Sequence, residues 1–304
     1  MELYKKHRPA SLDYFEGNTD MVASFREILE RDKEDIPHAH LFTGPSGCGK
    51  TTLARIFASA VGCADCDFTE VDSADFRGID TIRDIRSQMN LMPMGGDVQV
   101  WLLDECHMLS GPAQEALLKA LEDTPKRVFF LLATTVPQKL LKTIRNRCTP
   151  FEVQPLTDKR MYRLLKRVSK VEELDIPEPV LERIIADSLG SSRMALVILD
   201  KVRGLPQAKM LKAAESAAAA ENEVIELCRA LIRGDDWKKI AAILKGLDAD
   251  PENIRRVVLG YCQSCLLGGR GDAYDLMDCF REPTYNIGMP GITMACWEAA
   301  HPEE

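Results

Sequence analysis

The pattern of hydrophobic and polar positions changes near residue 157. Before this point, short apolar runs alternate with amphipathic segments, which predicts strands separated by helices. After it, apolar residues recur at helical spacing and the strand-like runs stop. The predicted strands cover residues 40–42, 68–72, 98–105, 128–133 and 151–153.

Helices are predicted where apolar residues recur every three or four positions behind a capping or turn signal. In the first half they cover residues 19–31, 53–61, 78–89, 112–121 and 138–146. In the second half they cover residues 158–173, 178–189, 192–202, 207–221, 223–233, 237–247, 253–267 and 292–300. Prolines and glycines predict a linker at residues 204–206 and a loop at residues 282–291.

Length and composition narrow the class of protein. A chain of 304 residues is too long for one ordinary core, so we expect two or three domains. With 45% hydrophobic and 28% charged residues, the composition is that of a globular protein. The 39 basic and 47 acidic residues give a net charge of -8, so bulk charge does not favour DNA. Any nucleic-acid contact must be a local basic patch or one built by assembly.

The chain begins without an apolar segment, and its longest uninterrupted apolar run is residues 128–133. We therefore expect neither secretion nor membrane insertion. The 10 cysteines are then expected to be reduced thiols. Two CxxC pairs, Cys63 with Cys66 and Cys262 with Cys265, leave zinc binding or simple thiols open. Thiols are favoured, because the first pair lacks a nearby second pair and the second lies in a helical pattern, where buried thiols are common.

The clearest chemical signal is the stretch of residues 41–52, LFTGPSGCGKTT. Its Gly-x4-Gly-Lys-Thr pattern joins a predicted strand to a predicted helix, as in a P-loop. Glycine lets the backbone wrap round a phosphate with its N–H groups turned inward. We expect Lys50 to reach the β and γ phosphates and Thr51 to ligate magnesium. The residues expected to hold the nucleotide are Gly44, Pro45, Ser46, Gly47, Cys48, Gly49, Lys50, Thr51 and Thr52.

Two acidic residues, Asp104 and Glu105, close the third predicted strand. At a strand end beside the P-loop, Asp104 can hold magnesium through its water shell, and Glu105 can orient and deprotonate the attacking water. Adjacent acids on an apolar strand would otherwise be costly. The pattern predicts a Walker B motif, with Thr51 and Asp104 as metal ligands and Glu105 as the base.

Two further groups leave alternatives open. Thr134 and Thr135 follow the fourth predicted strand, where a hydroxyl can sense a γ-phosphate, although threonines are common at strand ends. Arg147 follows a predicted helix. It can stabilise the charge on a transferred phosphoryl group or serve as a surface ion-pair partner.

Together these motifs resemble the ATPase subunits of sliding-clamp loaders in the AAA+ superfamily, both the bacterial tau/gamma type and the small subunits of replication factor C. The similarity runs from about Lys6 to Val202. Residues 6–9, KHRP, resemble the adenine-side segment of the family, with His7 where an aromatic residue is usual. This implies that Arg8 and Pro9 lie beside the base. Residues 104–109, DECHML, are similar to the bacterial Walker B motif.

The resemblance extends to two segments that read the γ-phosphate. Residues 133–140 are similar to the bacterial sensor 1 segment, which implies Thr135 as the sensor. Residues 190–196 resemble the sensor 2 helix, which implies that Arg193 reports the γ-phosphate, with Met194 where an acid is usual. The bacterial family also carries a four-cysteine zinc module, of which this chain keeps two cysteines, so zinc is not carried over.

Two motifs imply contacts with other molecules. Arg147 and Cys148 resemble a Ser-Arg-Cys motif whose arginine reaches the neighbouring subunit's ATP site, with Asn146 in place of the serine. Residues 74–80 resemble the replication factor C loop that faces DNA. The implied DNA contacts are Arg77, Arg83 and Arg86.

The resemblance implies an α/β fold with a P-loop AAA+ parallel-sheet domain, a helical lid and an all-α collar. These domains are expected at residues 1–156, 157–204 and 205–304, the last of which matches in length and helicity alone. The implied cofactors are ATP and Mg2+. The implied partners are a sliding clamp, primer-template DNA and the other clamp-loader subunits of a five-membered ring, with a DNA polymerase left open. This assembly would work in the cytoplasm, at a cellular or viral replisome on the nucleoid.

Two alternatives remain. Another AAA+ DNA motor, such as a branch-migration helicase or a recombination factor, shares the same core and would show ATP-driven translocation without a clamp. A nucleotide-bound scaffold would never hydrolyse its ligand. Such a scaffold would need neither Glu105 nor Arg147, which speaks against it.

Overall fold

The computed structural model describes residues 1–221, 223–247, 249–267, 270–271, 273–284 and 287–301. Within them the chain divides into two compact units. One unit contains Lys5–Arg160 and Ser191–Arg193, and we call it the sheet unit. The other, the helical unit, contains Met1–Tyr4, Met161–Gly190 and Met194–Glu304. The separation of a lid from a collar near residue 204 stays a prediction.

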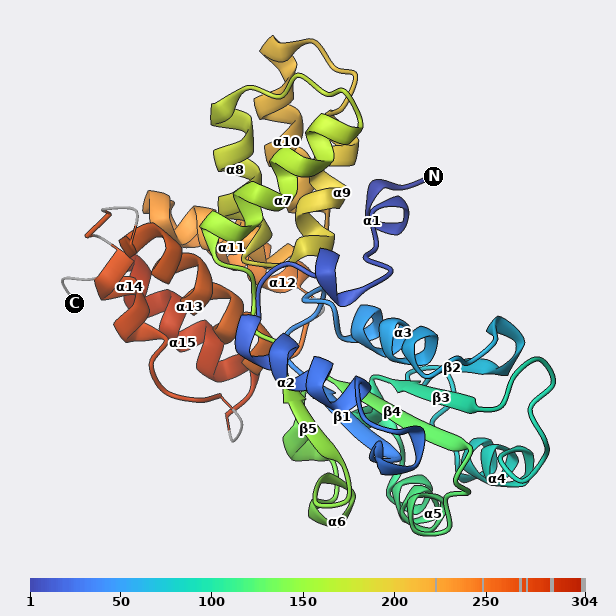
Figure 1. Cartoon of the computed structure of the whole chain (residues 1–304). Coiled ribbons are helices and arrows are strands. Elements are labelled where there is room, and N and C mark those ends of the chain that lie inside the picture. Colours follow the sequence, from blue (N-terminus) through green and yellow to red (C-terminus); the bar gives the residue numbers. More distant parts are fainter. Residues whose placement is uncertain (222, 248, 268–269, 272, 285–286, 302–304) are drawn as a thin grey trace. The chain divides into compact units, whose positions relative to one another are not determined.

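The sheet unit is built around five parallel strands in the order β2-β3-β4-β1-β5 (Figure 1). The strands are β1 Ala39–Thr43, β2 Phe68–Asp72, β3 Gln99–Asp104, β4 Val128–Thr134 and β5 Thr149–Glu152. The five predicted strands are therefore confirmed, and each end agrees within two residues. The expected α/β parallel-sheet fold is confirmed as well.

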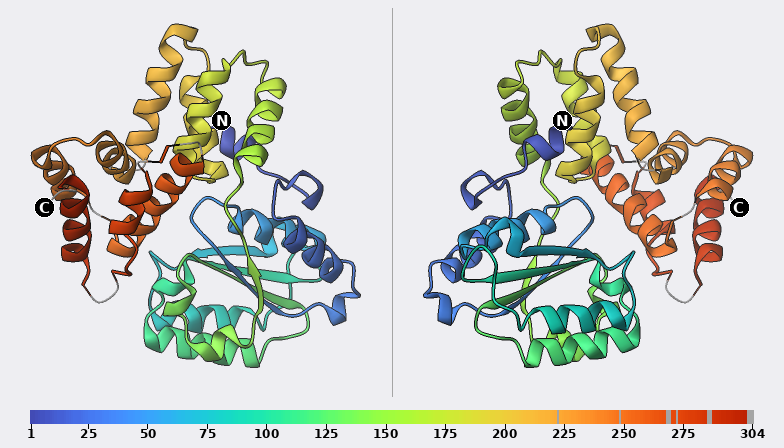
Figure 2. Two further views of the ribbon diagram at one scale, coloured as in Figure 1. Left: turned by 90° about the vertical axis from the view of Figure 1, so that its left-hand side faces the viewer. Right: turned by 90° about the vertical axis from the view of Figure 1, so that its right-hand side faces the viewer.

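Helices cover both faces of this sheet (Figures 1 and 2). The elements of the unit are α2 Thr19–Leu29, α3 Lys50–Ala60, α4 Ile79–Gln88, α5 Gly111–Glu122 and α6 Lys142–Arg145, with short 3-10 turns η1 Leu12–Tyr14, η2 Lys33–Asp35, η3 Asp65–Asp67, η4 Cys106–Met108 and η5 Pro137–Lys139. Alternate residues of β4 face opposite layers: Phe129 and Leu131 pack with α2 and α3, whereas Phe130 and Leu132 pack with α4 and α5. A strand buried on both faces reads as a continuous apolar run, which is why the sequence predicted β4 so clearly.

The helical unit contains no strand among its described residues. Its helices are α7 Asp158–Val171, α8 Glu178–Ser188, α9 Ser192–Val202, α10 Gln207–Glu221, α11 Glu223–Arg233, α12 Trp237–Gly246, α13 Pro251–Leu267, α14 Ala273–Cys279 and α15 Met289–Ala300, with α1 Leu3–Lys6 at the start of the chain. The sequence predicted all of these except the short α1 and α14. No helix in the described part of the chain is both long and apolar enough to cross a membrane.

The helix predicted at residues 138–146 is wrong as a single element. The structure has the turn η5 and the short α6, separated by Leu140 and Leu141, whose ψ values of 142° and 135° are not helical. The side chain of Gln114 on α5 bridges this break. Its Nε2 donates to the carbonyl oxygen of Lys139 at 3.3 Å, and its Oε1 accepts the N–H of Leu141 at 2.9 Å. Backbone groups that a helix would have paired are therefore satisfied by a side chain distant in sequence.

The loop predicted at residues 282–291 ends earlier than expected. Helix α15 begins at Met289 and holds Pro290 in its first turn. Proline is tolerated there because the first N–H groups of a helix have no intrahelical partner. Residues that predicted a break therefore begin the helix.

One histidine, His40, is fully buried in β1. Its ring lies among the rings of Phe25, Phe57 and Phe151, with centroid distances of 6.5, 4.8 and 5.9 Å. Burial lowers the pKa of this imidazole to about 4, from an ordinary value of 6.5. The folded protein thus keeps the ring neutral under conditions where the unfolded chain takes up a proton, so stability is lost as the pH falls from about 6.5 towards 4.

We expect His40→Leu to remove this part of the acid sensitivity. In the wild type, the lowered pKa of His40 predicts that the free energy of unfolding falls by about 2 kcal/mol between pH 7 and pH 5. The reason is that this imidazole takes up a proton in the unfolded state and not in the folded state. Urea unfolding at the two pH values measures the difference. Phe57→Leu, which changes a ring packed against His40 and keeps the imidazole, is the control and should keep most of the wild-type pH dependence. Equal pH dependence of His40→Leu and the wild type would contradict the prediction.

Candidate functional site

The carboxyl ends of β1, β3 and β4 lie side by side at one edge of the sheet (Figure 1). The register pairs Thr43 with Thr134 and Leu103 with Leu132. The carboxyl ends of these strands are therefore aligned. The alignment brings together the loop after β1, the acidic residues after β3 and the hydroxyl residues after β4. Three segments far apart in sequence meet there because parallel strands end at a common edge.

The loop between β1 and α3 depends on glycine. Gly44, Gly47 and Gly49 have φ of 141°, 74° and 108°, in the region that side chains disfavour. A Cβ on Gly44 would lie 2.1 Å from the carbonyl oxygen of Val153, and one on Gly47 would lie 2.1 Å from the hydroxyl oxygen of Ser191. At these three positions a residue with a Cβ would be strained. The loop can therefore turn tightly, as a loop that surrounds a phosphate must.

Lys50, the first residue of α3, folds back over this loop. Its Nζ donates to the carbonyl oxygens of Gly44 and Pro45, each at 2.9 Å, and the residue is buried. Burial lowers the pKa of the ammonium group, while the carboxylates of Glu105 and Asp104 act against this. The cation is held by neutral carbonyl groups, and an anionic phosphate would bind it more strongly.

Thr51 and Asp104 form the oxygen pair predicted to bind magnesium. The Thr51 hydroxyl donates to Oδ2 of Asp104 at 2.8 Å, and Oδ1 of the same carboxylate accepts the N–H of Glu105 at 2.9 Å. Mg2+ takes oxygen ligands at about 2.1 Å in octahedral geometry, which puts neighbouring ligands about 3 Å apart. The two oxygens therefore fit adjacent ligand positions of this ion, which would neutralise charge on a bound phosphate.

Glu105 follows β3 in left-handed backbone conformation, with φ of 44°. Its Oε2 accepts a hydrogen bond from the Thr135 hydroxyl at 3.2 Å and lies 3.2 Å from Nδ1 of His107. That nitrogen is also 3.0 Å from the Thr134 hydroxyl. Burial lowers the pKa of the His107 imidazole, although the Glu105 carboxylate opposes this. No role for His107 was predicted from the sequence, and its position two residues after the predicted base was the available signal.

A distant segment closes over the same loop. The Ser192 hydroxyl and the backbone N–H of Arg193 both donate to the Gly47 carbonyl oxygen, at 3.1 and 3.4 Å. Arg193, the predicted γ-phosphate sensor, is therefore anchored at the loop through its backbone. Ser192 was not singled out as a site residue, although it stands beside the predicted arginine.

The predicted adenine-side residues Arg8 and Pro9 are not joined to the loop. Among the described residues, neither makes a hydrogen bond to residues 44–52, and the N–H of Arg8 donates to the Lys5 carbonyl oxygen at 3.4 Å. Phe15, which sequence reasoning missed, lies against the loop instead. A Cβ on Gly49 would be 2.9 Å from its ring.

Arg147 lies at the other edge of the sheet. Its guanidinium donates to the Glu122 carboxylate at the end of α5, at 2.5 Å, and to the Thr143 carbonyl oxygen at 3.2 Å. Thr149, two residues later, pairs with His40 at the start of β1. The P-loop follows the far end of that strand, so about six residues at 3.3 Å each separate them, roughly 20 Å. The structure therefore does not bring Arg147 to the chain's own loop.

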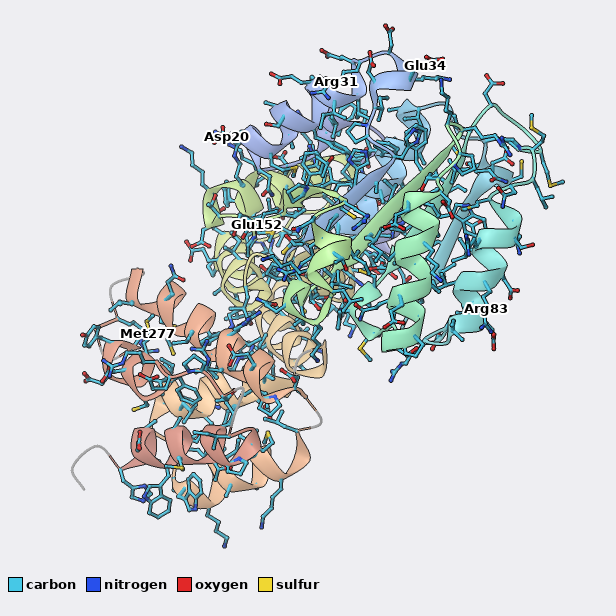
Figure 3. All side chains as sticks on the ribbon, turned by 90° about the horizontal axis from the view of Figure 1, so that it is seen from below. Asp20, Arg31, Glu34, Arg83, Glu152 and Met277 are labelled. Atoms are coloured by element: carbon cyan, nitrogen blue, oxygen red, sulfur yellow. The ribbon has the colours of Figure 1, made fainter. Side chains whose placement is uncertain are left out.

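The three predicted DNA contacts are exposed and lie near or on α4. Arg77 donates to the Ala74 carbonyl oxygen at 2.8 Å. Arg83 pairs with Asp80 at 2.9 Å, and it points away from the sheet in Figure 3. Arg86 pairs with Asp123 at 2.8 Å. None of these contacts joins the arginines to the P-loop.

The strand order and the site define the class of protein. A solved structure of a RuvB variant from Thermotoga maritima superposes with a TM-score of 0.64 at 25% identity, over 86% of this chain and 91% of that one. A second RuvB variant from the same organism gives 0.61 at 26% identity, over 78% and 85%. The chain is a member of the AAA+ ATPases.

Sequence relatives define its place within that class. DNA polymerase III subunit tau of Bacillus subtilis is 36% identical over 220 residues, which are 66% of this chain and 39% of the relative. DNA polymerase III subunit gamma/tau of Mycobacterium tuberculosis is 33% identical over 225 residues, with the same coverage. The subunit gamma of Buchnera aphidicola (Schizaphis graminum) is 33% identical over 219 residues, 65% of this chain and 60% of the relative. A family model described as DNA polymerase III, delta subunit, matches residues 65–157.

The chain is therefore a homologue of the gamma and tau subunits of DNA polymerase III. It spans about two fifths of the length of the first two relatives.

We expect Lys50→Ala to weaken ATP binding by at least about tenfold, because a hydrogen bond between a cation and phosphate contributes about 1.5–3 kcal/mol. Titration with a fluorescent ATP analogue measures the dissociation constant. Lys126→Ala, which removes a fully exposed lysine, is the matched control and should bind as the wild type does. Unchanged affinity of the Lys50 variant would show that the loop does not hold the nucleotide.

Proposed function

We propose that this chain is the ATPase subunit of a DNA sliding-clamp loader. It would use ATP binding and hydrolysis to open a ring-shaped clamp and load it on primer-template DNA, within a ring of five clamp-loader subunits. The relatives named as DNA polymerase III subunits support the replication role. The observation that carries the proposal is that one edge of the sheet holds a nearly complete hydrolysis site while Arg147 lies at the other edge.

In the proposed reaction, Lys50 binds the β and γ phosphates, and Thr51 and Asp104 hold the magnesium ion beside them. Glu105 accepts a proton from a water molecule whose oxygen attacks the γ-phosphorus. The bond to the β-phosphate oxygen breaks, giving ADP and phosphate. Thr135 donates to Glu105, and the backbone N–H of Arg193 donates to Gly47. These contacts support the proposal that both residues sense the γ-phosphate.

Arg147 would complete the ATP site of a neighbouring copy. Its roughly 20 Å separation from the chain's own loop excludes a role in that site. The ion pair with Glu122 joins two side chains that are 40% and 44% exposed, and such surface pairs contribute at most about 1 kcal/mol. Arg147 could therefore leave Glu122 for a phosphate of the nucleotide bound by the next subunit at a small cost in free energy. Hydrolysis would then depend on subunit geometry.

Arg77, Arg83 and Arg86 are the proposed DNA contacts. The Asp80 and Asp123 pairs of the latter two are exposed, so phosphate groups can replace them at small cost. Convergence of such patches in an assembled ring would explain how a chain of net charge -8 binds DNA.

We place the assembly in the cytoplasm, at the replisome, with a DNA polymerase as a further partner. Residues 157–204 would act as the lid and residues 205–304 as the collar that joins the subunits.

The likeness to RuvB supports a second function. One solved relative carries the description "Holliday junction branch migration motor", with 23% identity and a TM-score of 0.61. This degree of likeness shows a shared fold. A branch-migration motor would use ATP to move along DNA and would not respond to a clamp. The two functions therefore predict different effects of a clamp on the ATPase rate.

We expect the ATPase rate of the assembly to rise only when both a sliding clamp and primed DNA are present, because the two together complete the loading cycle. Steady-state phosphate release, with each component omitted in turn, measures this. Blunt duplex DNA of the same length is the control. Stimulation by DNA with no effect of the clamp would favour the branch-migration motor.

We expect Arg147→Ala to lower assembly-dependent ATP turnover at least about a hundredfold while ATP affinity stays at the wild-type value. The reason is that a trans arginine stabilises charge formed during hydrolysis, an effect worth a thousandfold or more in related sites. Arg145→Ala, two residues earlier and also exposed, is the matched control and should keep turnover. Unchanged turnover in the Arg147 variant would remove the trans role.

A further inference from the structure

His107 is a partly buried polar side chain to which the proposed hydrolysis assigns no role. It lies on η4, the turn that follows Asp104 and Glu105 in the chain, and its side chain is 10% exposed. Its Nδ1 lies between the Glu105 carboxylate and the Thr134 hydroxyl, at 3.2 and 3.0 Å. A partly buried polar group so close to the predicted base calls for a chemical explanation.

The contact with Glu105 determines which ring nitrogen carries the proton. A carboxylate can only accept hydrogen bonds, so a ring nitrogen at 3.2 Å is favourable only when it bears hydrogen. The lowered pKa of His107 means that the ring is neutral at pH 7 and carries one proton. The carboxylate 3.2 Å away favours that proton on Nδ1. The Thr134 hydroxyl accepts the N–H of Val136 at 3.0 Å, which holds its oxygen beside the imidazole.

Two polar groups lie against one oxygen of Glu105. The Thr135 hydroxyl donates to Oε2 at 3.2 Å, and Nδ1 of His107 lies 3.2 Å from the same atom, so Oε2 has a polar neighbour on two sides. In the described part of the chain, Oε1 of the same carboxylate accepts no hydrogen bond. A carboxylate fixed through one oxygen presents the other in a defined direction. The water-activating atom is then Oε1, because Oε2 already accepts the Thr135 hydroxyl and faces Nδ1 of His107.

We propose that His107 is a positioning residue for ATP hydrolysis: its Nδ1–H holds Oε2 of Glu105 so that Oε1 takes the proton of the attacking water. This inference rests on the proposed function, because it assigns a role within that reaction. The proton passes from water to Oε1, and the water oxygen forms the bond to phosphorus. His107 itself neither gives nor takes a proton in this step.

The test compares side chains that keep or lose the donor. Asparagine places its Nδ2–H group close to the position of imidazole Nδ1, whereas alanine has no donor. We expect His107→Ala to lower kcat about tenfold or more, since a hydrogen bond to a charged group contributes about 1.5–3 kcal/mol. The KM for ATP should stay within about twofold, because His107 makes no contact with the P-loop in the described structure. His107→Asn should recover turnover to within about threefold of the wild type.

Two further measurements separate positioning from a structural role. The ATP dissociation constant should be the same in all three proteins, and thermal unfolding shows whether each variant is folded. Thr134→Val, which removes the hydroxyl beside Nδ1, should lower kcat less than His107→Ala, because Nδ1 keeps its carboxylate partner. Stimulation by clamp and primed DNA is recorded for each protein.

The possible results point to different failures. A wild-type kcat in folded His107→Ala overturns the positioning role and leaves clamp loading intact. Equal loss of kcat in the alanine and asparagine variants, accompanied by a lowered melting temperature, also overturns it, in favour of a structural role. A wild-type assembly that hydrolyses ATP without any response to the clamp removes the proposed function, and the His107 comparison still tests positioning there. A wild-type chain that hydrolyses no ATP removes both proposals.

Discussion

The common direction of the five strands is the constraint on which the site depends. It delivers the ends of β1, β3 and β4 to one edge, where Lys50, Asp104 and Thr135 come together. The register that aligns them is fixed by burial on both faces, because a slip of one residue would exchange the two layers of side chains. Packing far from the phosphate loop therefore sets distances within it.

The same strand direction separates Arg147 from the loop after β1. Arg147 precedes β5 and thus belongs to the opposite edge, together with Glu122 at the end of α5. The cation of Lys50 is buried in the chain's own loop, whereas the guanidinium of Arg147 is 40% exposed and pairs with Glu122. If Arg147 acts in a neighbouring copy, as proposed, hydrolysis would be sensitive to assembly without any change in the fold of the single chain.

Departures from the sequence-based predictions have identifiable causes. The helix predicted at residues 138–146 is broken because Gln114, in another helix, offers hydrogen bonds that compete with helical pairing. Helix α15 starts earlier than predicted because Pro290 is compatible with a first turn as well as with a break. Helix α14 is only seven residues long, too short for a periodic pattern to stand out. In each case, local sequence allowed two outcomes and tertiary contacts selected one.

The sequence by itself determined the strands, the glycine-rich loop, and the acids after β3, because these depend on local chemistry: buried apolar runs, positive φ and charge at a strand end. Only the tertiary structure decided that His107 meets Glu105 and that Arg147 lies far from Lys50. Neither relation appears in a local pattern, since each depends on how strands pair and in which direction they run.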